Sequence, residues 1–133
     1  MHRNPNIRRG AFTLVEIMIV MAIIALLASI AVPNFLRSRK RAQAAQVLED
    51  LRLIDSAVDQ YSLEYSKSKG AAVAWADIQI YLKQGSSLYT SNGCDTLGNS
   101  FIIPSVDNTP RVPTATFSAL SDIAPSSFWS PFN

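Results

Sequence analysis

The chain has 133 residues and a formal net charge of +2, so it has room for one small domain and too little net charge to indicate a nucleic-acid partner by itself. Three of its twelve basic residues lie in the first ten positions, where there is no acidic residue: Arg3, Arg8 and Arg9. The rest of the chain has nine basic and ten acidic residues. The single cysteine, Cys94, excludes a disulfide bond within the chain.

The first predicted element is an apolar helix long enough to cross a membrane. From Phe12 to Val32 there are 21 residues, of which only Thr13, Glu16 and Ser29 are polar. At a rise of 1.5 Å per residue they span about 30 Å, the thickness of a bilayer core. The residues alone leave three interpretations open: a secretory signal peptide cleaved at a small-x-small site near Ser29, a permanent anchor, and a segment that first anchors the chain and later serves elsewhere.

The start of this run, Gly10-Ala11-Phe12-Thr13-Leu14-Val15-Glu16, resembles the prepilin-peptidase site of type IV pilins and type II secretion pseudopilins. The resemblance implies that the leader is cut before a residue that is usually Phe, that the new amino terminus is N-methylated, and that Glu stands fifth in the mature chain. Counted from Phe12, Glu16 is fifth and Pro33 is twenty-second, where many members carry proline. A cut after Gly10, the usual residue before the cut in this family, would spoil both positions. We therefore predict the cut between Ala11 and Phe12, with N-methylation on Phe12.

Glu16 is the one carboxylate in the apolar run, where an unpaired charge costs several kcal/mol. In a filament core of packed helices, the freed amino group of Phe12 on one subunit can pair with Glu16 of its neighbour. This pairing predicts a role in subunit assembly for both residues. The alternative is a carboxylate that snorkels to the headgroups from near the helix end, and it stays open.

Pro33 closes the apolar run and predicts a kink or local melting of the helix between Ser29 and Asn34. A basic stretch that we interpret as a membrane flank follows, made of Arg37, Arg39, Lys40 and Arg41. Clustered Lys and Arg can also bind phosphates, but no interleaved aromatic residue or second basic cluster supports a nucleic-acid partner. Basic residues on both sides of the run leave the topology undecided. The pilin resemblance implies a cytoplasmic leader and a head outside the bacterial inner membrane.

Beyond the basic stretch, apolar residues at steps of four and three predict an amphipathic helix that continues to about Ser66. Its apolar seam consists of Val47, Leu51, Ile54, Val58, Tyr61 and Tyr65. After Gly70 we expect a short helix over 75–82, strands at 101–103 and 114–117, and a tail pinned to the head by the aromatic residues of 128–132. The expected fold class is α+β: a long N-terminal helix, transmembrane in its first half and amphipathic in its second, packed on a small antiparallel β-sheet head as in pilins.

The segment from Asp95 to Phe101 bears a weaker resemblance to a turn that precedes a strand in the heads of pseudopilins. Gly98 and Asn99 form a turn pair that tolerates positive φ, and Asp95 can cap this turn through its side chain. Family members of the pseudopilin type can bind calcium in the following loop. The oxygen donors there have no recognisable calcium-loop spacing, so no metal site is assigned; they are Asp107, Asn108 and Asp122.

The sequence carries no catalytic constellation. Once the leader with His2 is cut, no histidine remains, which leaves Cys94 without the base that a Cys/His nucleophile needs, and we interpret Cys94 as a small core residue. No phosphate loop, serine elbow, zinc-ligand cluster or haem motif is present. We therefore expect a non-enzymatic chain that needs no cofactor.

The predicted domain organisation has four parts: a leader over 1–11, a transmembrane or filament-core helix over 12–35, an amphipathic helix of the head over 36–69, and a small globular head over 70–133. The resemblance implies four partners: prepilin peptidase, an inner-membrane assembly platform, the lipid bilayer before assembly, and further copies of the chain. The product would be a homopolymeric type IV pilus-like filament at the cell surface or a periplasmic type II secretion pseudopilus. The alternative is a membrane-tethered or secreted small binding domain, which needs neither a cut before Phe12 nor Glu16.

Overall fold

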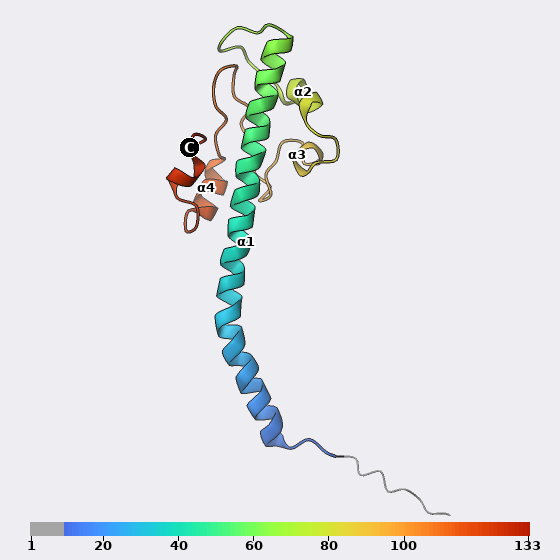
Figure 1. The fold of residues 1–133 in the computed structure, drawn as a ribbon, viewed down its shortest axis with the longest axis vertical. Helices are drawn as coiled ribbons and strands as arrows, with labels where there is room; N and C mark the ends of the chain where they lie inside the picture. Colours follow the sequence, from blue (N-terminus) through green and yellow to red (C-terminus); the bar gives the residue numbers. More distant parts are fainter. Residues whose placement is uncertain (1–9) are drawn as a thin grey trace, which may run out of the picture. The chain divides into compact units, whose positions relative to one another are not determined.

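The computed structural model describes residues 10–133; most of the predicted basic leader, with Arg3, Arg8 and Arg9, lies outside the described residues. One long helix, α1 (Leu14–Glu64), dominates the chain (Figure 1). The chain divides into two compact units between Leu36 and Arg37. We call the described part of the first, residues 10–36, the N-terminal unit, and the second, residues 37–133, the head unit.

The sequence of α1 favours an uninterrupted helix over 51 residues, since it contains no glycine and a single proline, Pro33. The helix runs through Pro33, so the predicted local melting between Ser29 and Asn34 is wrong. A proline in a helix leaves the carbonyl four residues before it without its usual donor, and here that carbonyl belongs to Ser29. The strongly helix-favouring residues on both sides hold the segment helical despite this loss. The kink at Pro33 stays a prediction.

The head unit is built around the second half of α1. The predicted seam is confirmed at its first five positions, which are buried: Val47, Leu51, Ile54, Val58 and Tyr61. Tyr65 is 55% exposed because α1 ends at Glu64, one residue before it. The described head therefore packs against four turns of the helix, and the seam ends one position earlier than its spacing predicts.

Short helices cover this seam. They are α2 (Trp75–Ile78), the 3₁₀ helix η1 (Gln79–Tyr81), α3 (Ser87–Thr90), α4 (Thr114–Leu120) and the 3₁₀ helix η2 (Ser126–Trp129). Within the head unit, α2 and α3 lie on one side of α1 and α4 on the other (Figure 1). The predicted helix over 75–82 is formed by α2 and η1, and it buries Ile78 and Leu82 in the core.

The predicted β-sheet is not confirmed. Residues 10–133 contain no strand, only two isolated antiparallel bridges, Cys94 with Ser100 and Ile102 with Arg111. The predicted strand at 114–117 is wrong, because these residues begin α4. Pro113 is the N-cap directly before the helix, and helical spacing places Thr116 and Leu120 together in the interior. Of the expected fold class, the long helix is confirmed.

The C-terminal tail is pinned to the head, as its aromatic residues predicted. Trp129 is completely buried, and Phe132 is buried in the same core. Phe128 is 37% exposed. The indole Nε1 of Trp129 donates to the carbonyl of Ala124 over 3.1 Å, so its polar atom is satisfied in the interior. The tail thereby closes the end of the core near Val112, whose N–H donates to the carbonyl of Phe132 over 2.9 Å.

Candidate functional site

The predicted processing site lies just before α1. Gly10, Ala11 and Phe12 are exposed and stand outside the helix, with Phe12 83% exposed. A peptidase needs an accessible, non-helical segment, and these residues provide one.

Thr13 and Glu16 form a reciprocal cap at the first turn of α1. The N–H of Thr13 donates to Oε2 of Glu16 over 2.8 Å, and the N–H of Glu16 donates to Oγ1 of Thr13 over 3.2 Å. This capping box satisfies two of the N–H groups that a helix start leaves unpaired. The sequence analysis assigned Thr13 no role, although Thr-x-x-Glu before an apolar run is the signature of such a cap. The carboxylate of Glu16 is thus held by Thr13, the residue directly after the predicted new terminus at Phe12.

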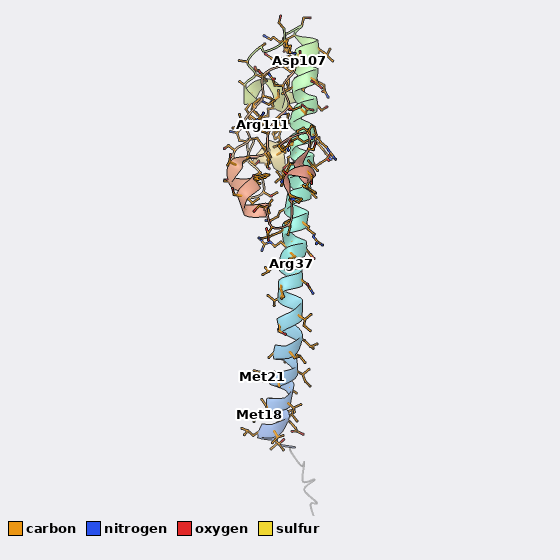
Figure 2. The ribbon with its side chains drawn as sticks, turned by 90° about the vertical axis from the view of Figure 1, so that its left-hand side faces the viewer. Met18, Met21, Arg37, Asp107 and Arg111 are labelled. Carbon is orange, nitrogen blue, oxygen red and sulfur yellow. The ribbon has the colours of Figure 1, made fainter. Side chains whose placement is uncertain are left out.

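The surface of the N-terminal unit is almost entirely apolar. Its large apolar side chains are at least half exposed, among them Met18 and Met21, which project from the bare helix in Figure 2. Within α1 lies a window of mean hydropathy 2.7, none of it buried, which meets the length and composition of a membrane span; signal sequences meet the same criterion. An exposed apolar surface of this extent must be covered by lipid or by other protein chains.

The basic stretch is divided between two environments. Lys40 turns onto the head, where its Nζ lies 2.9 Å from Oδ2 of Asp122, while Arg37, Arg39 and Arg41 are exposed. The hydrogen bond from Lys40 lowers the pKa of Asp122, and the charge of Arg37 acts in the same direction. Of the four basic residues, Lys40 is thus engaged by the head, and the membrane flank stays a prediction.

The turn at Asp95 has the geometry that its sequence predicts. Oδ1 of Asp95 accepts from the N–H groups of Leu97 over 2.9 Å and of Asn99 over 2.8 Å, which confirms the predicted side-chain cap. Gly98 has a φ of +86°, the left-handed conformation expected at this turn. Oδ2 of Asp95 accepts a short hydrogen bond from the hydroxyl of Thr116 on α4, so the turn is tied to the interior of the head.

A second carboxyl, Asp50 of α1, lies in the same interior. Asp50 is 2% exposed, and its one side-chain partner is Nε2 of Gln46 at 3.0 Å. Burial raises the pKa of Asp50, and the charges of Asp95 and Glu49 add to this effect. Asp50 is not among the residues of the predicted seam. Yet it follows Val47 by three residues and precedes Ile54 by four, and this spacing could have revealed it.

Neither a metal site nor a catalytic cluster emerges from the part of the chain that the structure describes. In residues 10–133, no three His, Cys, Asp or Glu side chains lie together so that they could hold a metal ion. The interpretation of Cys94 as a core residue is wrong: it is half-buried, outside the apolar core, with Sγ 3.5 Å from Oγ of Ser100.

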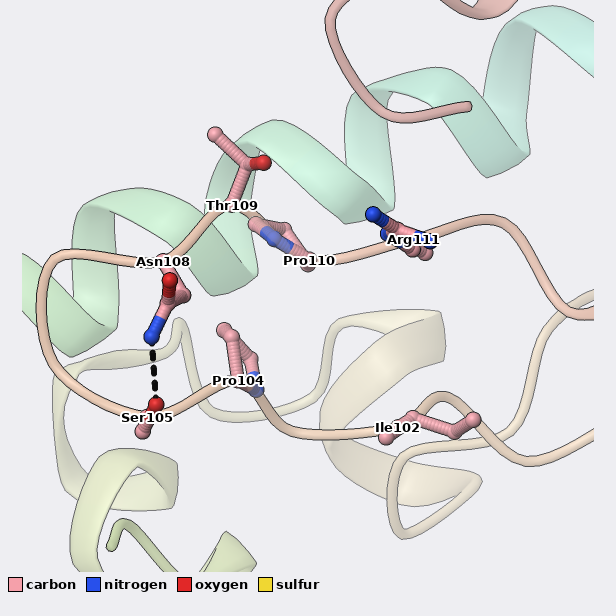
Figure 3. A pocket seen from close by; sticks show the side chains of 7 residues that line it. All are labelled: Ile102, Pro104, Ser105, Asn108, Thr109, Pro110 and Arg111. Atoms are coloured by element: carbon pink, nitrogen blue, oxygen red, sulfur yellow. Dashed lines mark hydrogen bonds between the residues drawn. The ribbon is translucent and has the colours of Figure 1, made fainter. Parts of the chain in front are cut away.

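A shallow surface pocket of about 290 Å³ lies over the loop that returns from Ile102 to Arg111 (Figure 3). Nδ2 of Asn108 donates to Oγ of Ser105 over 2.6 Å across the loop, and Arg111 is the one charged residue among those that line the pocket. Asn108 is therefore engaged within its own loop, and Asp107, beside it, has a φ of +65° as part of the same turn.

Comparison with known proteins finds similarity over part of the chain. The family model described as the prokaryotic N-terminal methylation motif matches residues 6–32. Type II secretion system core protein G of Klebsiella pneumoniae is 40% identical over 60 residues, which are 45% of this chain and 43% of that protein. The corresponding protein of Klebsiella michiganensis is 42% identical over 60 residues, 45% of this chain and 42% of that protein.

Type IV major fimbrial protein FimA of Dichelobacter nodosus is 32% identical over 80 residues, 60% of this chain and 51% of that protein. The chain thus spans about half or less of the length of these relatives, and no solved structure matches it. The segment matched by the family model holds the predicted processing site, which is exposed, and the capped Glu16. This segment carries the prokaryotic N-terminal methylation motif, and the chain is similar over part of its length to a type II secretion system core protein and to a type IV fimbrial protein.

Proposed function

We propose that the chain is a structural filament subunit, made as a prepilin, cut between Ala11 and Phe12, methylated on Phe12, and polymerised through its N-terminal helix. The observation that carries this proposal is the bare apolar helix of the N-terminal unit, which begins at an accessible processing site within the matched methylation motif. Before assembly, lipid covers this surface; in the filament, the helices of other subunits replace the lipid.

The pairing of Phe12 with Glu16 sets the register of each subunit relative to its neighbour in the filament. Oε2 of Glu16 accepts from the N–H of Thr13, which fixes the carboxylate at the end of the helix and leaves its second oxygen open to a further donor. The cut creates an ammonium group on Phe12, and in a packed core the ammonium of a neighbouring subunit can bind this oxygen. Loss of one partner would strand the other charge in a low-dielectric core at a cost of about 3–5 kcal/mol, enough to exclude a subunit out of register.

The remaining parts follow from this role. The helix over 12–35 holds the precursor in the bacterial inner membrane as a single pass, with the leader over 1–11 in the cytoplasm where the peptidase cuts. Arg37, Arg39 and Arg41 face the headgroups at the outer end of the span. The helix over 36–69 and the globular part over 70–133 form the head, which lies outside the membrane. An inner-membrane assembly platform then adds each subunit to the filament.

Two filament types fit this subunit. The relatives named type II secretion system core protein G and the Asp95 turn favour a periplasmic pseudopilus, while the relative named as a fimbrial protein fits a surface pilus. We favour the pseudopilus, because the turn at Asp95 resembles a turn in the heads of pseudopilins. The second class of function, a membrane-tethered binding domain, has no use for a cut at Phe12.

The test separates the charge of Glu16 from its capping bond. Glu16→Gln keeps an acceptor for the N–H of Thr13 but removes the negative charge, and Glu16→Ala removes both. We expect both variants to be inserted and cut normally, with filament yield reduced at least tenfold, because the buried ammonium of Phe12 loses its partner. Glu49→Gln, which neutralises an exposed carboxylate on the same helix, is the matched control.

Filament yield is measured in the sheared or pelleted fraction, cleavage by gel mobility, and insertion by resistance to alkaline extraction. A normal filament yield from Glu16→Gln would refute the pairing role and leave capping as the function of Glu16. Failure of both variants to be cut would move the role of Glu16 to recognition by the peptidase.

A further inference from the structure

Two carboxyl groups from distant parts of the chain are buried in the head unit. Asp50, on α1, is 2% exposed, and Asp95, in the turn before α4, is 5% exposed. In the described part of the chain, the ion pairs are Lys40 with Asp122 and Arg52 with Glu49, so neither buried carboxyl has a cationic partner there. Two unpaired negative charges in one small interior would be costly.

The hydrogen bonds distinguish the two groups. Asp95 accepts from the N–H groups of Leu97 and Asn99 and from the hydroxyl of Thr116, a set of donors suited to a carboxylate. Asp50 has the single amide of Gln46. Asp50 is therefore the carboxyl that can take up a proton with the smaller loss of hydrogen bonds, and its protonation would relieve the repulsion.

We propose that Asp50 is a proton-operated lock between α1 and the turn at Asp95. With Asp50 protonated, the interior carries one charge, which Thr116 and the turn hold, and α1 packs tightly against them. When Asp50 loses its proton, two charges share the interior, and the contact between α1 and the turn is weakened. The lock is a property of the head and does not depend on the proposed filament function.

The direction of the pH dependence follows from the groups that face Asp50. These are Asp95 from the turn and Glu49 from the same helix, both acidic, and together with burial they raise the pKa of Asp50. The stabilisation is complete below the unfolded pKa of about 3.9 and is lost as the pH rises through the pKa of the folded state. Between these limits the unfolding equilibrium constant rises by up to about tenfold per pH unit.

Asp55, a second aspartate of α1, could produce a similar pH dependence of unfolding and therefore supplies the control. Burial and the charge of Asp59 also raise the pKa of Asp55, which lies on the same helix but is only half-buried. Asp50→Asn and Asp55→Asn therefore remove the same charge from α1 at two different depths. Asp122 acts in the opposite direction, since Lys40 lowers its pKa and its contribution is lost as the pH falls.

The experiment uses the full chain in detergent micelles, with unfolding of the head by urea followed through Trp75 and Trp129 at pH 4, 5, 6 and 8, so that the series begins near the unfolded pKa of about 3.9. We expect the wild-type head to unfold at a lower urea concentration as the pH rises. Asp50→Asn should flatten this dependence to less than about threefold in the unfolding constant and should be more stable than wild type at pH 8. Asp55→Asn should keep most of the dependence.

An Asp50→Asn head that keeps the full dependence would overturn the lock, as would one less stable than wild type at every pH. If Asp50→Asn does not fold, carboxyl ¹³C NMR of the wild-type chain decides. Titration of Asp50 above the ordinary range of aspartate supports the lock, and titration at or below about 3.9 overturns it.

Discussion

Trp129 offers the most direct test of the head core, because it is the largest side chain that is completely buried. A buried Trp removes roughly 150–250 Å² of surface from water, which at about 25 cal/mol per Å² contributes about 4–6 kcal/mol. Its hydrogen bond to the carbonyl of Ala124 adds about 1 kcal/mol. Since the unfolded chain already buries part of this surface, we expect Trp129→Ala to lower the free energy of unfolding by about 3–5 kcal/mol.

That loss is a large share of the stability of a domain of about a hundred residues, which is roughly 5–15 kcal/mol. The assay is urea unfolding of the full chain in micelles, followed by the fluorescence of Trp75, the only other tryptophan in the chain and part of the same head. Phe128→Ala is the matched control, because Phe128 is adjacent and partly exposed, and it should cost less than about 1.5 kcal/mol. An unfolding midpoint for Trp129→Ala equal to that of wild type would refute the described core.

Three further changes test the turn and the end of α1. Thr116→Val keeps the shape of the side chain but removes the hydroxyl that donates to Asp95, so it should lower the free energy of unfolding, measured in urea, by about 1–3 kcal/mol. Thr116→Ser keeps the hydroxyl and should not show this loss. Gly98→Ala should cost about 1 kcal/mol in the same assay, since an alanine at φ of +86° is strained although its Cβ meets no neighbour. The hydrogen bond to Glu64 raises the pKa of Tyr81 to about 12, so spectrophotometric titration should show one late tyrosine that Glu64→Gln returns toward 10; four tyrosines titrating together near 10 would contradict this bond.

Local signals explain what the sequence predicted well. The spacing of Val47, Leu51 and Ile54 is a property of one helix, and Asp95 and Gly98 form a turn within five residues, so each could be recognised without its surroundings. The cap formed by Thr13 and Glu16 is equally local, and Thr-x-x-Glu before an apolar run is enough to predict it.

The errors arose where distant residues decide the outcome. A run of four residues such as 114–117 suits a strand or a helix equally, and the choice was made by the burial of Thr116 and Leu120 in the head. Lys40 meets Asp122 across 82 positions, a pairing that no local pattern contains. Asp50 and Asp95 are both buried in the head for the same reason, because only the folded head encloses the helix and the turn in one interior.

The central claim is that the chain is processed at Phe12 and then polymerised. The most direct test is mass spectrometry of the amino-terminal peptide of the protein isolated from the membrane or filament fraction of its native host. We predict a methylated chain that begins at Phe12, four residues before Glu16. A chain that begins at Met1 or at Val32 would contradict the claim, since neither terminus places an ammonium group within reach of a neighbour's Glu16.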